Sequence, residues 1–287
     1  MLYKEYDSET LKKLQKIETE ILRDFDELCT KHGITYFGCG GTAIGVVRHG
    51  GFIPWDDDID IAMTRKDYEK FLKVAELPEY AEKYKLVNAE TVPSYPLMTS
   101  RWCRKGTKFK EESLKHVPDE LGIFLDIFCF DNIPDNQLMM WIHAWRCWFW
   151  GKLLILYWMD TPVLYDSGLV KTLELTGCKI AHKLLRLIPL KPSFYYSRAK
   201  KVSKEFYGKK TKRVNYMHDP KPCMSIMNKS DIFPVKKMKF DDLMVSEPKN
   251  IEAYLLQRYG EGYMTCPPED KRHNHPPYEL DLGEEQQ

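Results

Sequence analysis

The amino-acid sequence predicts a sheet domain of the α/β or α+β class, because strand patterns alternate with helix patterns along its first half. Apolar residues recur at steps of three and four over 8–31, which is the helical period. Short apolar runs with strand character follow, the longest being GIFLDIFCF at 122–130. The 287 residues are 43% hydrophobic and 30% charged, which predicts one large domain or a domain with an appended lobe.

Each expected element follows from a local pattern. The first helix is expected to begin at Ser8 as N-cap and to end at Gly33. The segment ITYFGCGGTAIGVVRHGG predicts a short strand, a glycine turn and a short helix, and IDIAM and RKDYEKFLKVAEL predict a strand and a helix. Further strands are expected near 85–87, at 99–104 and at 122–130.

Overall composition excludes some functions. The formal net charge is +1, so no basic excess indicates a nucleic-acid partner. Eight cysteines form no CxxC pair, and several lie in apolar runs, which predicts reduced core residues of a cytoplasmic protein. The polar start MLYKEYDSETLKK does not have the pattern of a signal peptide.

An acidic run is the most informative feature. Four aspartates, at 56, 57, 58 and 60, lie within five positions, and such carboxylates repel one another unless a cation screens them. Strand alternation places Asp58 and Asp60 on one face, with α-carbons about 6.5 Å apart, and Asp56 extends that face. Carboxylate ligands alone favour Mg²⁺ or Mn²⁺.

Two further features support phosphate chemistry at this run. Gly40, Gly41 and Thr42 lie between a strand and a helix, where glycine permits close approach and a helix N-terminus favours a phosphate. Asp126 is a lone acid inside an apolar strand and is the candidate for a third metal ligand. Asp126 capping a turn or pairing with an arginine is the alternative.

Three other kinds of site share features with this acidic run. An EF-hand loop starting at Asp56 requires Gly and Glu where Ile61 and Asp67 stand, so it is rejected. A dinucleotide site fits Gly38, Gly40 and Ala43, but the helix is interrupted early and one acid would suffice. The Asp-x-Asp metal site of a nucleotide-sugar glycosyltransferase uses the same metal chemistry and stays open.

The segments GGTAIGVVRHGGFIPWDDDIDIAM and LDIFCFDNIP resemble the LicD family, which includes the fukutin-related proteins. The resemblance runs from about 34 to 131 and resumes at 254–275. It implies a nucleotidyltransferase-like mixed sheet flanked by helices, with a helical C-terminal part. Residues 1–135 are then expected to form the catalytic core, and 136–287 a mostly helical region that completes the site and contacts membrane or acceptor.

The resemblance also implies an activity: Mg²⁺-dependent transfer of phosphocholine or an alditol phosphate from a CDP-linked donor to a glycan, lipopolysaccharide or teichoic-acid hydroxyl. It places the catalytic metal carboxylates on Asp58, Asp60 and Asp126, with Asp56 in support, and the phosphate turn on 40–42. Nucleotidyl or glycosyl transfer, and an inactive nucleotide-binding module, remain alternatives.

Other polar residues are weaker candidates. Arg48 and His49 are expected at the donor phosphate, or else as solvated loop residues. Arg101, with Arg104 and Lys105, is expected to neutralise the leaving nucleotide. Lys271 and Arg272, with His273 and His275, are expected to form a basic wall facing phosphates. Zinc at Cys266, His273 and His275 is disfavoured, because only three ligands are visible.

Two segments bear on location. The Trp-rich run Leu138–Met159 predicts a buried helix first, an interfacial membrane helix second and a membrane span last, since His143, Arg146 and Lys152 interrupt it. Arg198–Arg213 carries eight basic residues against Glu205, which indicates a solvated helix face or attraction to anionic headgroups. The expected location is cytoplasmic, with peripheral contact to the inner face of the cell membrane and to a lipid-linked glycan acceptor.

Overall fold

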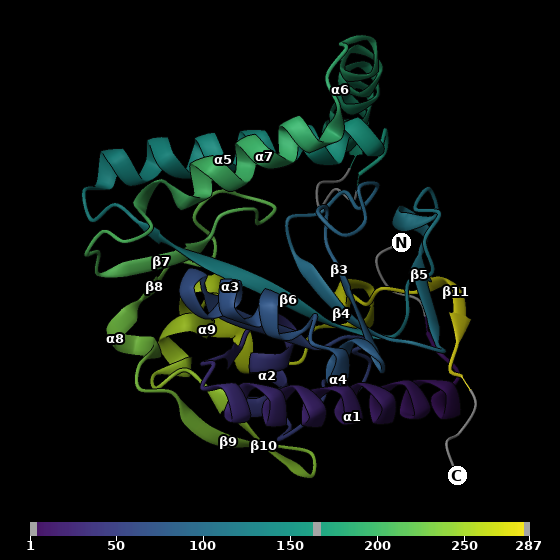
Figure 1. The fold of residues 1–287 in the computed structure, drawn as a ribbon, viewed down its shortest axis with the longest axis vertical. Coiled ribbons are helices and arrows are strands. Elements are labelled where there is room, and N and C mark those ends of the chain that lie inside the picture. Colours follow the sequence, from purple (N-terminus) through teal and green to yellow (C-terminus); the bar gives the residue numbers. More distant parts are fainter. Residues whose placement is uncertain (1–4, 163–167, 284–287) are drawn as a thin grey trace.

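The computed structural model describes residues 5–162 and 168–283. A mixed sheet forms its centre, in the order β1-β2-β6-β4-β3, and β7 pairs with the second half of the long strand β6 and with β8 (Figure 1). The strands are β1 (Phe37–Gly38), β2 (Asp60–Thr64), β3 (Tyr84–Val87), β4 (Ser100–Arg104), β5 (Lys108–Glu111), β6 (Phe124–Ile133), β7 (Arg213–Tyr216), β8 (Met227–Asn228), β9 (Lys236–Phe240), β10 (Leu243–Glu247) and β11 (Pro277–Asp281).

Helices flank this sheet, as the sequence predicts. They are α1 (Ser8–His32), α2 (Gly40–Arg48), α3 (Arg65–Val74), α4 (Pro78–Ala81), α5 (Gln137–Trp158), α6 (Gly168–Leu187), α7 (Pro192–Ser203), α8 (Lys229–Ile232) and α9 (Ile251–Tyr259). Only the pair β2 and β6 is parallel among the described strand pairs of this sheet, so the α/β class with a mixed sheet is confirmed.

Helix α1 shows why the first prediction holds and where it was wrong. Its buried residues recur at helical spacing and face the sheet, and Gly33 ends it at φ 57°, a conformation that glycine adopts without strain. The N-cap is Asp7, not Ser8: the Asp7 carboxylate accepts the Thr10 amide at 2.9 Å.

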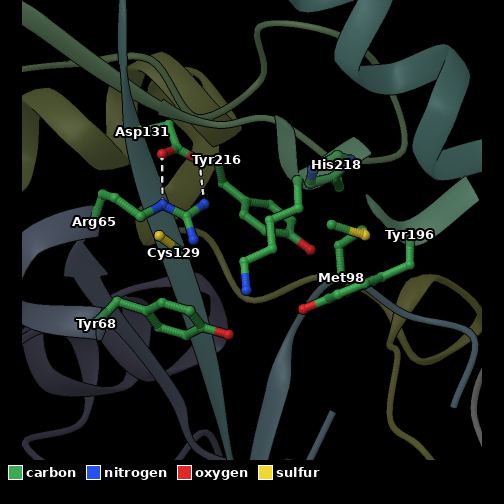
Figure 2. Close-up of a pocket in the computed structure, with 9 residues that line it drawn as sticks. Arg65, Tyr68, Met98, Cys129, Asp131, Tyr196, Tyr216 and His218 are labelled. Atoms are coloured by element: carbon green, nitrogen blue, oxygen red, sulfur yellow. Dashed lines mark hydrogen bonds and ion pairs between the residues drawn. The ribbon is translucent and has the colours of Figure 1, made fainter. Parts of the chain in front are cut away.

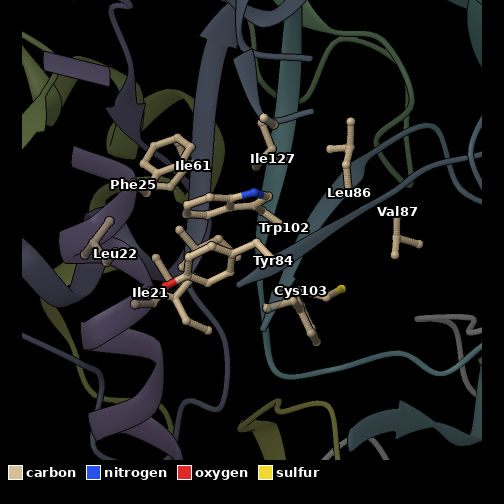
Figure 3. Packing of buried hydrophobic residues seen from close by; sticks show 14 of the residues in the cluster. Ile21, Leu22, Phe25, Ile61, Tyr84, Leu86, Val87, Trp102, Cys103 and Ile127 are labelled. Atoms are coloured by element: carbon tan, nitrogen blue, oxygen red, sulfur yellow. The ribbon is translucent and has the colours of Figure 1, made fainter. Parts of the chain in front are cut away.

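Strand alternation divides the interior into two apolar clusters, one on each face of the sheet. In β2, Ile61 and Met63 join the cluster under α1 and α3, whereas Ala62 joins the cluster under α2 and α9. Trp102 lies in the first cluster with its ring stacked on Tyr84 at 3.7 Å between centroids, and Phe25 packs beside it (Figure 3).

The C-terminal half is partly helical and partly strand. β7 and β8 extend the central sheet, and β11 pairs with β5, so both halves of the chain build the sheet structure. Helices α5 and α7 pack together on the side of the sheet away from α1, with α6 beyond them (Figure 1).

Two expectations for this half were wrong. The Trp-rich segment does form a helix, α5, but it is not buried all round: Leu138, Trp141 and Trp145 are exposed. The basic run 198–213 is not one helix face, because α7 ends at Ser203 and the chain continues into β7. Within the described parts of the chain, every helix is too short or too polar to cross a lipid bilayer.

Candidate active site

The acidic run lies at the start of β2, on the face of the sheet covered by α2 and α9. Parallel pairing sets Asp60 of β2 directly beside Asp126 of β6, and antiparallel pairing sets Arg101 of β4 on the other side of Asp126. The three side chains therefore form one row across three neighbouring strands. Asp58 precedes β2 and reaches the same place, so that carboxylate oxygens of Asp58, Asp60 and Asp126 lie within 4.8 Å of one another.

This cluster of carboxylates is electrostatically unfavourable by itself. Burial raises the pKa of Asp60 to about 6, and Asp126 beside it adds to the shift. Burial also raises the pKa of Asp58 and of Asp56 well above the usual range, with Asp60 contributing to both. Ionising three converging carboxylates in this buried position costs free energy, and a divalent cation with oxygen ligands would offset that cost. The group could therefore hold a metal ion.

The first turn of α2 packs directly on these acids. Gly41 donates its amide to Asp60 Oδ2 at 3.2 Å, and the Asp60 amide donates to Thr42 Oγ1 at 2.7 Å. Gly40 has φ 54°, and a Cβ there would lie 1.9 Å from Asp60 Oδ2; a Cβ on Gly41 would lie 2.6 Å from an oxygen of Asp56. Only glycine therefore lets the helix N-terminus approach the carboxylates this closely.

From the sequence, Asp126 was expected to be a third metal ligand, with a turn cap or an arginine pair as the alternative. Its carboxylate is part of the cluster, and its Oδ1 also accepts Arg101 Nε at 3.0 Å. Arg101 is only 2% exposed, bonds Glu111 with its Nη2 and lies over the Phe124 ring at 3.7 Å. Burial raises the pKa of Asp126, and Arg101 opposes that rise.

A second group joins the acids to the C-terminal segment. The His275 amide donates to Asp57 Oδ1 at 2.8 Å, and His275 Nδ1 lies 3.2 Å from Asp58 Oδ2. Burial acts to lower the pKa of His275, but Asp58 and Asp57 outweigh it and raise that pKa well above 6.5. Tyr6, from the segment before α1, donates its hydroxyl to Asp57 Oδ2 at 2.6 Å.

The other predicted residues are distributed around this site. Arg48 donates to the carbonyls of Tyr263 and Thr265 at 3.3 Å, and its Nε lies 2.9 Å from His49 Nε2, so it fastens the C-terminal loop. Arg272 lies over the Trp55 ring, beside the acidic run, and Lys271 is exposed. Arg104 and Lys105 are directed elsewhere, to Glu20 and to the Ala81 carbonyl.

A hollow opens beside Asp60 and Gly40. Its walls include Phe128, Tyr216 and Tyr254, and the Tyr254 hydroxyl oxygen accepts a hydrogen bond from the Gly40 amide at 2.9 Å. Arg258 also lines the hollow and bonds Asp219 Oδ1 at 2.9 Å. A guanidinium and the Asp60 carboxylate thus face one space, and a guanidinium there suits a ligand that carries phosphate.

Comparison with known proteins agrees with this geometry. Residues 33–152 match the nucleotidyltransferase domain described as LicD/FKTN/FKRP. The chain is 35% identical over 133 residues to the lipopolysaccharide cholinephosphotransferase LicD of Haemophilus influenzae, covering 46% of this chain and 48% of that protein.

A shorter similarity links the chain to an uncharacterized protein of Rickettsia typhi, with 40% identity over 63 residues, or 22% of this chain and 20% of that protein. The chain therefore matches about half, or less, of the length of these relatives. The LicD-type match contains Asp58, Asp60 and Asp126, whereas Arg258 and His275 come from beyond its end.

A second hollow lies where β2 and β6 end, and a buried ion pair between α3 and β6 lines it. Arg65 bonds both oxygens of Asp131, at 2.8 and 2.6 Å, and both side chains are buried (Figure 2). Tyr68 and Tyr196 line the same hollow. This bidentate pair ties the start of α3 to β6.

Sequence reasoning missed three residues near the site. Glu18 is fully buried, and its carboxylate has no hydrogen-bond partner among the residues that the structure describes. Burial and Asp58 raise its pKa. One signal was available, since Glu18 falls on the apolar stripe of α1, four residues after Leu14. Glu111 and Arg258 gave no such signal, because only the tertiary fold brings them to the aspartates.

Proposed function

We propose that this chain is a transferase that moves a phosphate-linked group, phosphocholine or an alditol phosphate, from a CDP-linked donor to a hydroxyl of a cell-surface glycan. The observation that carries the proposal is the convergence of Asp58, Asp60 and Asp126 beside the N-terminus of α2. The similarity to a lipopolysaccharide cholinephosphotransferase supports transfer of phosphocholine and a lipopolysaccharide type of acceptor.

The proposed metal is Mg²⁺ or Mn²⁺, held by Asp58, Asp60 and Asp126. When bound, such an ion stabilises the charge that develops on the donor phosphates. Arg101 holds Asp126 in place through the 3.0 Å ion pair and favours its ionised form. Asp126 is then positioned to orient the acceptor hydroxyl and to take its proton.

The donor phosphates are proposed to lie between the first turn of α2 and Arg258. The Gly40–Thr42 turn contributes the positive end of a helix, although its Gly41 amide is shared with Asp60 in the structure. Arg48 and His49 support this end of α2, and Lys271 and Arg272 supply positive charge from the C-terminal loop. Asp56 packs against Gly41 and supports the acids.

The division of labour along the chain is part of the proposal. Residues 1–135 form the catalytic core with its N-terminal helix, and 136–287 complete the site. His275 and Arg258 support this division, since each contacts or faces an aspartate of the core. Acceptor recognition is also assigned to 136–287.

The experiment is product analysis with purified protein, Mg²⁺ and either CDP-choline or CDP-ribitol. Release of CMP is expected, because attack at the phosphate of the transferred group leaves CMP behind. Chelation by EDTA is expected to stop it, and Mg²⁺ or Mn²⁺ to restore it. Pyrophosphate release from a nucleoside triphosphate would instead favour nucleotidyl transfer. UDP or GDP release from a nucleotide sugar would favour glycosyl transfer, and tight donor binding with no turnover would favour an inactive binding module.

A further inference from the structure

Helix α6 exposes a continuous apolar stripe. Leu169, Leu173 and Leu187 are 83%, 73% and 80% exposed, and Ile180 and Leu184 complete the stripe at helical spacing. A leucine-rich face of this kind normally packs against something, because each side chain gains free energy on leaving water.

The stripe points away from the rest of the molecule. Helix α6 contacts α5 through its other side, where Leu185 is buried, His182 Nδ1 lies 2.8 Å from the Leu156 carbonyl oxygen and Arg186 lies over the Tyr157 ring. The stripe is therefore not the contact that holds α6 in place, and it is left without a partner among the described residues.

Helix α5 also exposes large apolar side chains. They are Leu138, Trp141, Ile142, Trp145 and Phe149, with Arg146 exposed among them. Both helices lie at the edge of the molecule opposite α1 (Figure 1). A stripe of this many exposed leucine and isoleucine side chains on one helix marks an interaction surface rather than ordinary surface variation.

The charges beside the stripe are basic. Helix α6 carries Lys171, Lys179, Lys183 and Arg186 against Glu174. Lys179 and Lys183 are residues of α6 next to the stripe residues Ile180 and Leu184. Both lysines are exposed, and neither makes an ion pair within the described parts of the chain. By contrast, two basic residues of the neighbouring region are neutralised, since Lys200 pairs with Glu90 and Arg146 with Glu205.

We infer that the outer surface of α5 and α6 docks on an anionic lipid bilayer, with the stripe in the headgroup layer and Lys179 and Lys183 on lipid phosphates or carboxylates. An apolar stripe flanked by unpaired lysines, with interfacial tryptophans, is complementary to such a surface. A symmetric dimer through the stripe fits less well, because it would bring the lysines of two copies together.

The test is sedimentation of the full chain with vesicles of phosphatidylcholine alone or with about one third phosphatidylserine, without donor or metal. Binding is expected to the anionic vesicles and to weaken in high salt. The double variant Lys179→Gln and Lys183→Gln is expected to bind about 30-fold more weakly, from two lost headgroup contacts. The double variant Leu173→Gln and Leu184→Gln is expected to bind the anionic vesicles at least about tenfold more weakly, because less apolar area leaves water on binding.

Matched controls are available on the opposite side of the molecule. Lys12→Gln with Lys16→Gln changes the same charge on exposed positions of α1, and Met244→Gln changes an exposed apolar residue of β10. Both controls are expected to bind vesicles as the wild type does. Equal loss in the controls and the α6 variants would overturn the inference, as would absence of binding to anionic vesicles at low salt.

A dimer is the competing occupant, and light scattering after size exclusion detects it. Two results together would overturn the bilayer assignment. The wild type would form a stable dimer that Leu173→Gln with Leu184→Gln converts to a monomer, and the wild type would not bind vesicles. Release of CMP from a CDP-linked donor in free solution is expected to be unchanged in the α6 variants. Failure of the proposed transferase activity and failure of membrane docking are thus distinguishable.

Discussion

Replacing Asp60 by asparagine is expected to make the metal-free protein more stable while removing its activity. Asp60 is partly buried at the start of β2 and faces Asp126, Asp58 and Asp56. Its pKa rises from 3.8 to about 6, first through burial and then through Asp126, while His275 and Arg258 oppose the rise. An asparagine has nearly the same shape and no charge.

The magnitude follows from linkage between proton binding and folding. A carboxyl group with a higher pKa in the folded protein binds its proton more tightly there, so stability falls as the pH rises from 3.8 to about 6. Above that pH range stability falls no further, and a pKa shift of about two units corresponds to a total loss of about 3 kcal/mol of stability. Asparagine keeps an oxygen that can accept the Gly41 amide. The free energy of unfolding of Asp60→Asn should therefore exceed that of the wild type by about 1–3 kcal/mol at pH 7.5.

Urea unfolding in EDTA measures this gain at pH 7.5 and again near pH 4, where the wild-type carboxyl is mostly protonated and the difference should shrink towards zero. Asp160→Asn is the matched control, because Asp160 is exposed and lies outside the cluster. A loss of stability for Asp60→Asn at pH 7.5 in EDTA would refute the idea that these carboxylates repel one another in the folded protein.

Three further changes test the same structure. Asp126→Asn should gain less stability in EDTA than Asp60→Asn, because Arg101 offsets part of the cost of burying the Asp126 carboxylate; urea unfolding compares the two variants, and an equal gain would contradict a stabilising ion pair. Arg258→Gln should cost about 3–5 kcal/mol by leaving the buried Asp219 unpaired, with Arg258→Lys as the milder comparison. Trp102→Ala should cost about 3–5 kcal/mol, measured by thermal unfolding, and an unchanged melting temperature would contradict its place in the core.

The local pattern of the sequence predicted much of the fold. The spacing of apolar residues located α1, and alternation in IDIAM and GIFLDIFCF located β2 and β6, because these patterns depend only on which side of an element faces the core. The acidic run was selected because four carboxylates crowd together, and Asp126 because it is a lone acid in an apolar strand. Their convergence in space agrees with that prediction, and their role as metal ligands stays a prediction.

The remaining features depend on contacts between distant segments. Arg101 was expected to meet a nucleotide, but its position opposite Asp126 follows from the register of β4 on β6, which no local pattern specifies. Arg258 and His275 reach the site only because the C-terminal segment returns to it. The outward face of α5 was missed because the helix is apolar nearly all round, and periodicity then gives no direction.

The rate of CMP release from CDP-choline or CDP-ribitol in Mg²⁺, for wild type and Asp60→Asn side by side, tests the central claim most directly. If a metal held by Asp58, Asp60 and Asp126 carries the transfer, Asp60→Asn should be at least about a hundredfold slower than wild type although its metal-free stability is higher. Mg²⁺ should raise the melting temperature of the wild type and not of the variant. An Asp60→Asn protein that releases CMP at the wild-type rate would contradict the claim.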